Sequence, residues 1–434
     1  MIGIRNVKTL IFLLMASYCV VSIVLYVTGT DKNTTTKNTS IARKTPTTTV
    51  TNSAQSISHN GFINNKYNSK WNKYVVGLKT STDTAAARVP IQLLTFLRHI
   101  SNVYFFGDSV EELGDTKVYD VVHNLYKDGN LSVIDVNGQL STSKNGVSNG
   151  WIMDAHKNLP GFKKLYELYP DRDWYLMLDD DTYLLFENLD SELKDLNPAE
   201  PYYFGAYFSF VGCGGIKNHG DGPDFAHGGS GIVVSRGALQ RMIKVIDDCI
   251  VDYRTCWAGD VRVALCLRDA NVTLDRRFHG RFINAEPDVD LDWPDNPCSY
   301  PLTFHHLKPK TIYELYATEN RVNKENRPTN YADIFKSIMA HQHEGGIQDN
   351  TDIKGYPFAQ TRTINKEKCK DVCRENIKCR AYVYDENGIC WLKGSIQKTN
   401  SVEQSRSSGF ITNNYICEEN EPKPAPTPTI SKLE

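Results

Sequence analysis

The sequence lacks an excess of charge of either sign. Its 434 residues include 49 Lys and Arg and 51 Asp and Glu, so the formal net charge is only -2 at pH 7. No long run of one sign stands out, and no internal repeat appears. Proteins that bind nucleic acid or acidic surfaces through charge carry a basic surplus. The composition therefore argues against nucleic acid as a partner.

Large apolar residues are almost absent from residues 28–70, where Thr, Ser and Asn dominate. A segment of this composition cannot bury a core. We therefore predict a flexible stem over residues 28–70.

The preceding residues 9–27 are, in contrast, uncharged and apolar. At about 1.5 Å per residue they approach the roughly 30 Å of a bilayer core. A cleaved secretory signal is the first alternative, but its apolar region is usually shorter and is followed by small residues. A buried helix is the second. We expect a cytosolic tail over 1–8, a transmembrane signal-anchor over 9–27, and a lumenal remainder.

Cysteine is plentiful in this chain. One of the eleven cysteines lies in the apolar segment (Cys19), five lie in the middle (Cys213, Cys249, Cys256, Cys266, Cys298), and five lie near the end (Cys369, Cys373, Cys379, Cys390, Cys417). In an oxidising lumen ten of them can pair, although the sequence does not fix the partners. The N-glycosylation tripeptides that begin at Asn33, Asn38, Asn130 and Asn271 fit the same compartment.

Two folded regions follow the stem. The segments "KYVVGLKTS", "AARVPIQLLTFLRHI" and "NVYFFGDS" read as strand, helix and strand, and "DWYLMLDDD" reads as a central strand. They predict an α/β domain over residues 71–345. A cysteine-rich α+β unit follows over 352–417, where one helix presents Cys369 and Cys373 to strands that bear Cys379 and Cys390. We expect this unit to fold independently, and the Pro-rich residues 418–434 to be disordered.

Three consecutive aspartates end the predicted central strand. Strand alternation points Asp179 and Asp181 to one side and Asp180 to the other. Two nearby carboxylates repel each other unless a cation lies between them, so the pattern favours a divalent metal site. An acidic turn is the alternative. Ligands of α/β sheets gather at the carboxyl ends of strands, which favours the site.

These residues belong to an ordered series of motifs. "DWYLMLDDDTYLL", "GGSGIVVSRGAL", "CWAGDVRVALC", "RFHGRF" and "FHHLKP" follow one another, and over about Lys73 to Thr318 the chain resembles Fringe-like and core 1 β1,3-galactosyltransferase-like enzymes of glycosyltransferase family 31. The cysteine-rich unit resembles a PAN/apple module. The first cysteine of that module, expected near residue 357, is missing, which leaves Cys417 without its expected partner.

The resemblance implies a GT-A, Rossmann-like fold and an inverting transfer from a UDP-sugar donor in the Golgi membrane. It implies that Asp179, Asp181 and His279 hold Mn²⁺ and that Asp180 belongs to the donor-binding residues. Carboxylate and imidazole ligands suit this metal. The alternative for His279 is a surface histidine between two arginines.

The acidic position of "AGDVRVAL" falls on Asp260, which the resemblance makes the catalytic base that takes the proton of the acceptor hydroxyl. Many relatives carry a second acidic residue immediately before it, where this chain has Gly259. A carboxylate at a helix N-terminus is the other interpretation of Asp260, and the two are compatible.

The remaining site residues also come from the resemblance. Thr80 and Arg88 match the nucleotide-binding edge of the first strand, although Arg88 reads equally as a solvated helix residue. Gly228, Gly229 and His306 match the sugar and acceptor pocket. A turn explains the glycines equally, and a structural role explains His305 and His306 equally.

The function expected from the sequence is a metal-dependent β1,3-glycosyltransferase that moves a hexose from a UDP-sugar to a glycan or glycoprotein. Galactose is the first choice of sugar, ahead of N-acetylglucosamine and glucose. A phosphatase with an Asp-x-Asp-x-Thr/Val motif is disfavoured, because Tyr183 occupies the last place. The second hypothesis is a lectin-like, inactive glycan-binding membrane protein.

Overall fold

The structure is a computed structural model of the chain. It describes residues 69–134, 140–141, 150–210, 212–213, 221–288, 291–343, 346–402 and 405–417. The predicted cytosolic tail, signal-anchor and C-terminal tail, and the stem up to residue 68, lie outside these residues and stay predictions. Residues 69 and 70 already belong to the 3-10 helix η1 (Ser69–Lys73). No helix in the described part of the chain is both long and apolar enough to cross a membrane.

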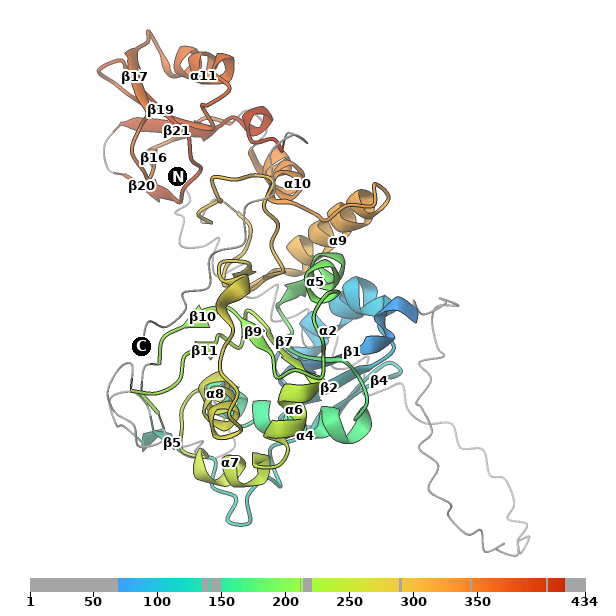
Figure 1. The fold of residues 1–434 in the computed structure, drawn as a ribbon. Coiled ribbons are helices and arrows are strands. Elements are labelled where there is room, and N and C mark those ends of the chain that lie inside the picture. Colours follow the sequence, from blue (N-terminus) through green and yellow to red (C-terminus); the bar gives the residue numbers. More distant parts are fainter. Residues whose placement is uncertain are drawn as a thin grey trace, which may run out of the picture. The chain divides into compact units, whose positions relative to one another are not determined.

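A seven-stranded mixed sheet forms the centre of the first domain (Figure 1). Its order is β3 (Glu111–Leu113), β4 (Thr116–Asp120), β2 (Val103–Gly107), β1 (Tyr74–Lys79), β7 (Trp174–Asp179), β12 (Ile232–Ser235) and β9 (Tyr203–Gly205). β4, β2, β1 and β7 are parallel, whereas β3, β12 and β9 pair antiparallel with their neighbours. The prediction of an α/β domain with "DWYLMLDDD" as a central strand is confirmed.

Helices cover both faces of this sheet. Alternate residues of β1 face opposite cores: Val76 and Leu78 pack in one, and Val75 packs in the other. The first core contains residues of α2 (Ala85–Leu94), α5 (Phe186–Leu193), α9 (Pro309–Asn323) and α10 (Tyr331–His343). The second contains residues of α4 (Asn158–Leu168), α6 (Arg236–Met242), α7 (Ile246–Asp252) and α8 (Gly259–Asp269). Burial on both faces explains why these strands read as continuous apolar runs.

Short elements complete the domain beside the end of β7. A three-stranded sheet has the order β13 (Phe282–Ile283), β14 (Thr303–Phe304) and β8 (Tyr183–Leu184). Because β14 pairs with β8 directly after the aspartates, it brings the "FHH" motif to them. The other short elements are η2 (Phe96–His99), α3 (Gly150–Ala155), η3 (Arg276–Phe278), and the strand pairs β5 (Val133–Ile134) with β6 (Leu140–Ser141) and β10 (Tyr207–Phe208) with β11 (Phe225–Ala226).

The cysteine-rich unit is an α+β fold, as predicted. Its five-stranded sheet has the order β15 (Gln348–Asp349), β21 (Arg406–Phe410), β18 (Ala381–Asp385), β19 (Ile389–Lys393) and β17 (Ala359–Arg362). β16 (Thr351–Ile353) pairs with β20 (Thr399–Ser401), and η4 is Thr412–Asn414. Helix α11 (Lys366–Glu375) carries both predicted staples: Cys369 bonds to Cys390 on β19, and Cys373 bonds to Cys379 just before β18.

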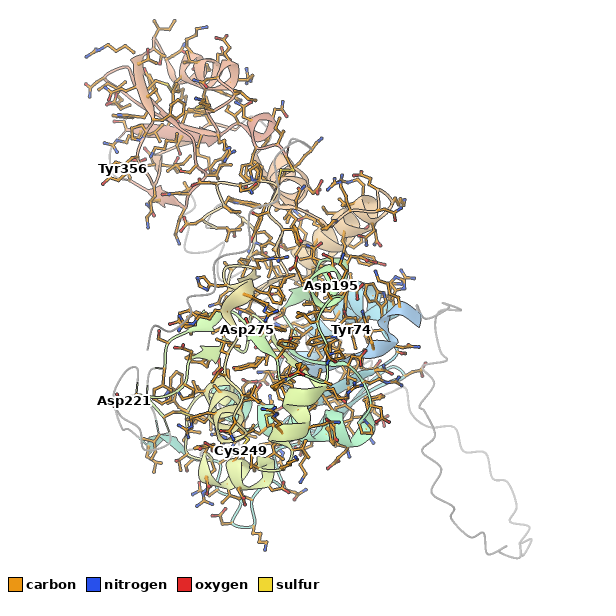
Figure 2. All side chains as sticks on the ribbon, viewed as in Figure 1. Tyr74, Asp195, Asp221, Cys249, Asp275 and Tyr356 are labelled. Carbon is orange, nitrogen blue, oxygen red and sulfur yellow. A yellow bond between two sulfur atoms is a disulfide. The ribbon has the colours of Figure 1, made fainter. Side chains whose placement is uncertain are left out.

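Cys417 has a partner outside this unit, in agreement with the expectation that its usual partner within the PAN/apple module is missing. It forms a disulfide with Cys298 of the α/β domain, while Cys213 pairs with Cys256 and Cys249 with Cys266. The same boundary is apolar. The side chains of the described residues are drawn in Figure 2. The ring of Phe335 lies 4.8 Å from that of Tyr415 and 4.8 Å from that of Trp293. The unit therefore shares a core with the α/β domain.

Truncation after residue 350 is expected to destabilise the α/β domain, contrary to the independent folding that the sequence suggested. The cut would expose Trp293 and Phe335 and remove the Cys298–Cys417 bond, and loss of a native disulfide alone typically costs about 2–5 kcal/mol. Thermal unfolding followed by circular dichroism checks this. Cys417→Ser in the full chain separates the disulfide from the packing, and an unchanged melting temperature after truncation would contradict the shared core.

A buried carboxyl group on α9 makes stability depend on pH. Glu319 accepts a 2.5 Å hydrogen bond from the hydroxyl of Tyr183, and burial raises the pKa of Glu319 from 4.5 to about 7. Between these values the folded state binds more protons than the unfolded state, so the free energy of unfolding falls as pH rises. Across the window the loss amounts to roughly 3 kcal/mol.

Glu319→Gln is expected to lack this pH dependence. Urea denaturation of both proteins between pH 4.5 and 8 should show the wild-type free energy of unfolding falling more than that of the variant. Parallel curves would show that Glu319 does not titrate in this window.

Candidate active site

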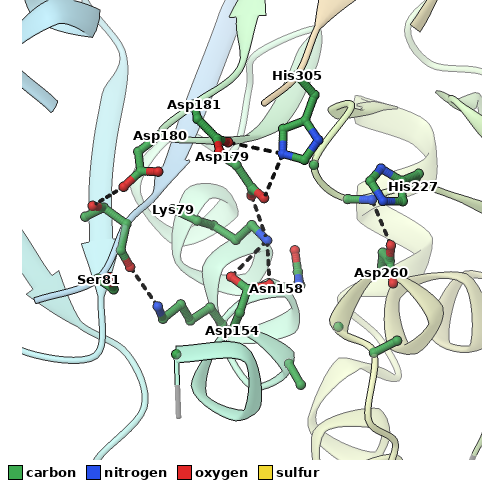
Figure 3. A pocket seen from close by; sticks show the side chains of 18 of the residues that line it. Lys79, Ser81, Asp154, Asn158, Asp179, Asp180, Asp181, His227, Asp260 and His305 are labelled. Atoms are coloured by element: carbon green, nitrogen blue, oxygen red, sulfur yellow. Dashed lines mark hydrogen bonds and ion pairs between the residues drawn. The ribbon is translucent and has the colours of Figure 1, made fainter. Parts of the chain in front are cut away.

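A cavity of about 660 Å³ opens at the carboxyl ends of β1 and β7 (Figure 3). It falls within the range of about 300–1,000 Å³ that is usual for small-ligand pockets. Lys79 and Asp179 are direct neighbours in the register of the two strands. The lining includes most of the predicted site residues: Thr80, Arg88, Asp179, Asp180, Asp181, Gly228, Gly229, Asp260 and His306.

Asp180 is held by the residues predicted at the nucleotide edge. Its carboxylate accepts 2.6 Å hydrogen bonds from the hydroxyls of Thr80 and Thr84 and a 2.9 Å bond from Arg88. Burial nevertheless raises the pKa of Asp180 above its ordinary value. Thr80 and Arg88 thus fix the aspartate turn, and they also line the cavity on that side.

Asp179 is paired with a lysine that sequence reasoning did not single out. Oδ1 of Asp179 lies 2.9 Å from Nζ of Lys79, whose side chain is only 3% exposed. Burial acts to raise the pKa of Asp179, but the charges of Lys79 and His305 and the hydrogen bond from Lys79 together lower that pKa. The neutralising charge beside Asp179 is therefore the ammonium group of Lys79. Asp179 is not one of the described residues that could hold a metal ion together, which are Asp181, His305 and His306.

Asp181, His305 and His306 form a group whose ligand atoms all lie within 4.8 Å of one another. Nδ1 of His305 donates to Oδ1 of Asn284 at 2.8 Å, which directs Nε2 toward Oδ1 of Asp181 at 3.1 Å. An imidazole oriented in this way by its other nitrogen is typical of metal-binding histidines. Burial opposes a low pKa of Asp181, but the hydrogen bond with His305 lowers it. One carboxylate and two imidazoles fit a borderline divalent ion.

His279, predicted as the third metal ligand, does not reach this group. The preceding residue, Phe278, is buried with its ring 4.8 Å from that of Phe204. His279 is exposed, with its ring edge-on to Tyr207. The sequence contains a second Phe-His pair, Phe304–His305, at the end of a short buried strand, and the histidine of this pair is the one that lies beside Asp181.

Asp260 lies on the opposite side of the cavity from the three aspartates (Figure 3). It stands in the first turn of α8 and accepts 2.8 Å hydrogen bonds from the backbone N–H groups of Gly228 and Val261. Burial raises the pKa of Asp260 against the effect of the bond from Gly228. A carboxylate with a raised pKa is the stronger proton acceptor, as a general base requires.

The two glycines connect this side of the cavity with the histidine side. A Cβ on Gly229 would lie 2.1 Å from Cε1 of His305, and a Cβ on Gly228 would lie 3.2 Å from Cβ of Asp260. Any side chain at Gly229 would therefore displace the imidazole. Gly229 is needed here for the close approach of His305, and both glycines line the cavity, where the sequence predicts the approach of a sugar.

The structure thus combines a mixed α/β sheet with a cavity at the carboxyl ends of two of its parallel strands. Residues 69–335, more than half of the chain, match the family model described as Fringe-like, and residues 349–393 match that of the PAN domain. The chain belongs to the Fringe-like family and carries a PAN domain at its C-terminal side.

Several curated proteins are similar to this chain. Chondroitin sulfate synthase 3 of Homo sapiens is 32% identical over 174 residues, which are 37% of this chain and 19% of that protein. Glycoprotein-N-acetylgalactosamine 3-beta-galactosyltransferase 1 of Xenopus laevis is 25% identical over 185 residues, 37% of this chain and 49% of that protein. Beta-1,3-glucosyltransferase of Homo sapiens is 25% identical over 164 residues, 36% of this chain and 30% of that protein. The chain thus spans less than half of each of these relatives.

Among solved structures, the chain is similar to the "crystal structure of a glycosyltransferase involved in the glycosylation of the major capsid of PBCV-1". The match has 15% sequence identity and a TM-score of 0.26, and covers 55% of this chain and 98% of that one. The family and the named transferases together support an enzyme of the hexosyltransferase class.

Proposed function

We propose that this protein is an inverting, metal-dependent β1,3-glycosyltransferase that moves a hexose from a UDP-sugar to a glycan or glycoprotein acceptor. The observation that carries the proposal is the placement of Asp260 across one cavity from the metal-capable group of Asp181, His305 and His306. An inverting displacement requires this separation, because the base and the leaving group act on opposite faces of the sugar.

Asp181, His305 and His306 are the residues that would hold the metal, with Mn²⁺ the expected ion. When bound, the ion would supply positive charge that stabilises the departing diphosphate. Thr80, Thr84 and Arg88 keep Asp180 in place at the nucleotide side. His306 has a positive φ of 62° and is exposed at the cavity, whereas His305 is buried.

Asp260 takes the proton from the acceptor hydroxyl as the new glycosidic bond forms. Its two backbone hydrogen bonds fix the carboxylate, and Gly228 couples its position to the loop that faces His305. The residue immediately before Asp260 is Gly259 and not a second carboxylate.

The cellular setting is part of the same proposal. The apolar residues 9–27, the sequons and the disulfides of the described residues support a type II Golgi membrane enzyme with a lumenal catalytic domain. Galactose is the proposed sugar, consistent with the hexose named in the galactosyltransferase relative.

Measurement of UDP release from UDP-galactose, UDP-glucose and UDP-N-acetylglucosamine, with Mn²⁺ and with EDTA, tests the proposal. We expect release from one UDP-hexose in Mn²⁺ and almost none in EDTA. Equal release under both conditions would reject metal dependence, and the absence of release from every donor would favour a lectin-like protein.

A further inference from the structure

Three polar residues with no role in the proposed function lie between the aspartates and Asp260 in Figure 3. They are Lys79 at the end of β1, Asp154 on α3 and Asn158 at the start of α4. All three line the cavity. We refer to them as the Lys79–Asp154–Asn158 corner.

Lys79 fixes the carboxylate of Asp154 in the corner. Nζ of Lys79 lies 3.1 and 3.0 Å from the two carboxylate oxygens of Asp154, and it pairs with Asp179 on its other side. Lys79 is buried, whereas 37% of the Asp154 side chain is exposed. A carboxylate offers about four lone-pair positions. Lys79 therefore fixes the carboxylate of Asp154, which can still accept further hydrogen bonds from a ligand in the cavity.

Asn158 provides the second, independent observation. Its side chain is only 1% exposed, and neither Nδ2 nor Oδ1 has a hydrogen-bond partner among the described residues. A buried amide without partners is costly and calls for an explanation. Gly259 makes room for it, since a Cβ at residue 259 would lie 2.1 Å from Nδ2 of Asn158. The amide thus occupies the space that a side chain at residue 259 would need.

The geometry of the proposed reaction places the donor sugar over this corner. The diphosphate would lie at the Asp181 group and the base is Asp260, so the anomeric carbon and its ring must lie between them. The inference rests on the proposed function for these positions of the diphosphate and the base. The charges of the corner then restrict which sugar can bind. One ammonium group, that of Lys79, pairs with the carboxylates of Asp154 and Asp179, and its charge also acts to lower the pKa of Asp260.

We propose that Asp154, positioned by Lys79, binds hydroxyl groups of an uncharged donor hexose, and that the amide of Asn158 completes this sugar site. Carboxylates accept hydrogen bonds from sugar hydroxyls and repel the carboxylate of a hexuronic acid. The corner therefore discriminates UDP-hexoses from UDP-hexuronates.

Asp154→Ala tests the first part. Isothermal titration in Mn²⁺ should show UDP-galactose or UDP-glucose, whichever the wild type turns over, bound about 10- to 100-fold more weakly, because a hydrogen bond to a charged group is lost. UDP alone should bind as to the wild type. The matched control is Asp247→Ala, which removes an exposed aspartate of α7 that is paired with Lys163 of α4. It should change neither affinity. Unchanged UDP-hexose affinity in Asp154→Ala would overturn the inference.

Asn158→Leu tests the second part, because its effects on melting temperature and on UDP-hexose affinity differ between a ligand-binding and a structural asparagine. Replacement of an unpartnered buried amide by an apolar side chain of similar size should leave the melting temperature equal or higher, while UDP-hexose affinity falls. A lower melting temperature with unchanged affinity would make Asn158 structural. Turnover of UDP-glucuronate by the wild type would also overturn the inference, whereas failure of the wild type to use any UDP-sugar would reject the proposed function itself.

Discussion

Asp260→Asn is expected to lower turnover by about 10²- to 10⁴-fold, the usual contribution of a general base. The affinity for UDP and Mn²⁺ should stay near that of the wild type, because Asp260 lies across the cavity from the metal-capable group. Steady-state kinetics and titration calorimetry measure the two effects. Normal turnover in this variant would place the base elsewhere.

The structure sharpens the control for this variant. Both carboxylate oxygens of Asp260 accept a backbone N–H, so an amide keeps only one of the two hydrogen bonds. Ser235→Ala removes another side-chain cap, the hydrogen bond from the N–H of Ala238 at the start of α6, without touching the cavity. Loss of a cap costs about 1 kcal/mol. If Ser235→Ala lost as much turnover as Asp260→Asn, instability would explain both.

The pH profile gives a second readout of the same residue. Because burial raises the pKa of Asp260 above 3.8, kcat/KM should fall as pH drops through that raised pKa, where the base becomes protonated. The acid limb should disappear in Asp260→Asn.

His305→Ala and Asp181→Asn are expected to abolish transfer and to weaken Mn²⁺-dependent UDP binding by at least about 100-fold. Loss of groups that merely orient metal ligands already costs about 10- to 100-fold, and these two residues contribute ligand atoms of the metal-capable group. Calorimetry with UDP in the presence of Mn²⁺ measures the affinity.

His279→Ala is the matched control for the metal site. It removes a histidine that the sequence suggested as a ligand and that the structure places beside Tyr207, so binding and transfer should stay near wild type. Loss of Mn²⁺-dependent binding in His279→Ala, with binding retained in His305→Ala, would reverse the assignment.

Much of the site could be predicted because its residues end recognisable strands. The run that ends at Asp179 is apolar and buried, so its position in the sheet and the acidic turn behind it are local properties of the sequence. The Ser235 cap of α6 and the first-turn position of Asp260 are equally local.

The residues that were missed depend on contacts between distant segments. Lys79 meets Asp179 because two parallel strands share a register, and Asn158 meets Gly259 because α4 packs on the start of α8. The choice between His279 and His305 depends on the pairing of β14 with β8. Likewise, the bond between Cys298 and Cys417 joins two units that the sequence separates by composition.

The anomeric configuration of the first product tests the central claim without knowledge of the acceptor. Water can replace the acceptor, so proton NMR can follow the hydrolysis of UDP-α-galactose, or of whichever UDP-α-hexose the protein uses. The account predicts that the β-anomer of the free sugar appears first in Mn²⁺, before mutarotation, and that EDTA stops its formation. Initial release of the α-anomer, or hydrolysis that continues unchanged in EDTA, would contradict an inverting, metal-dependent transfer.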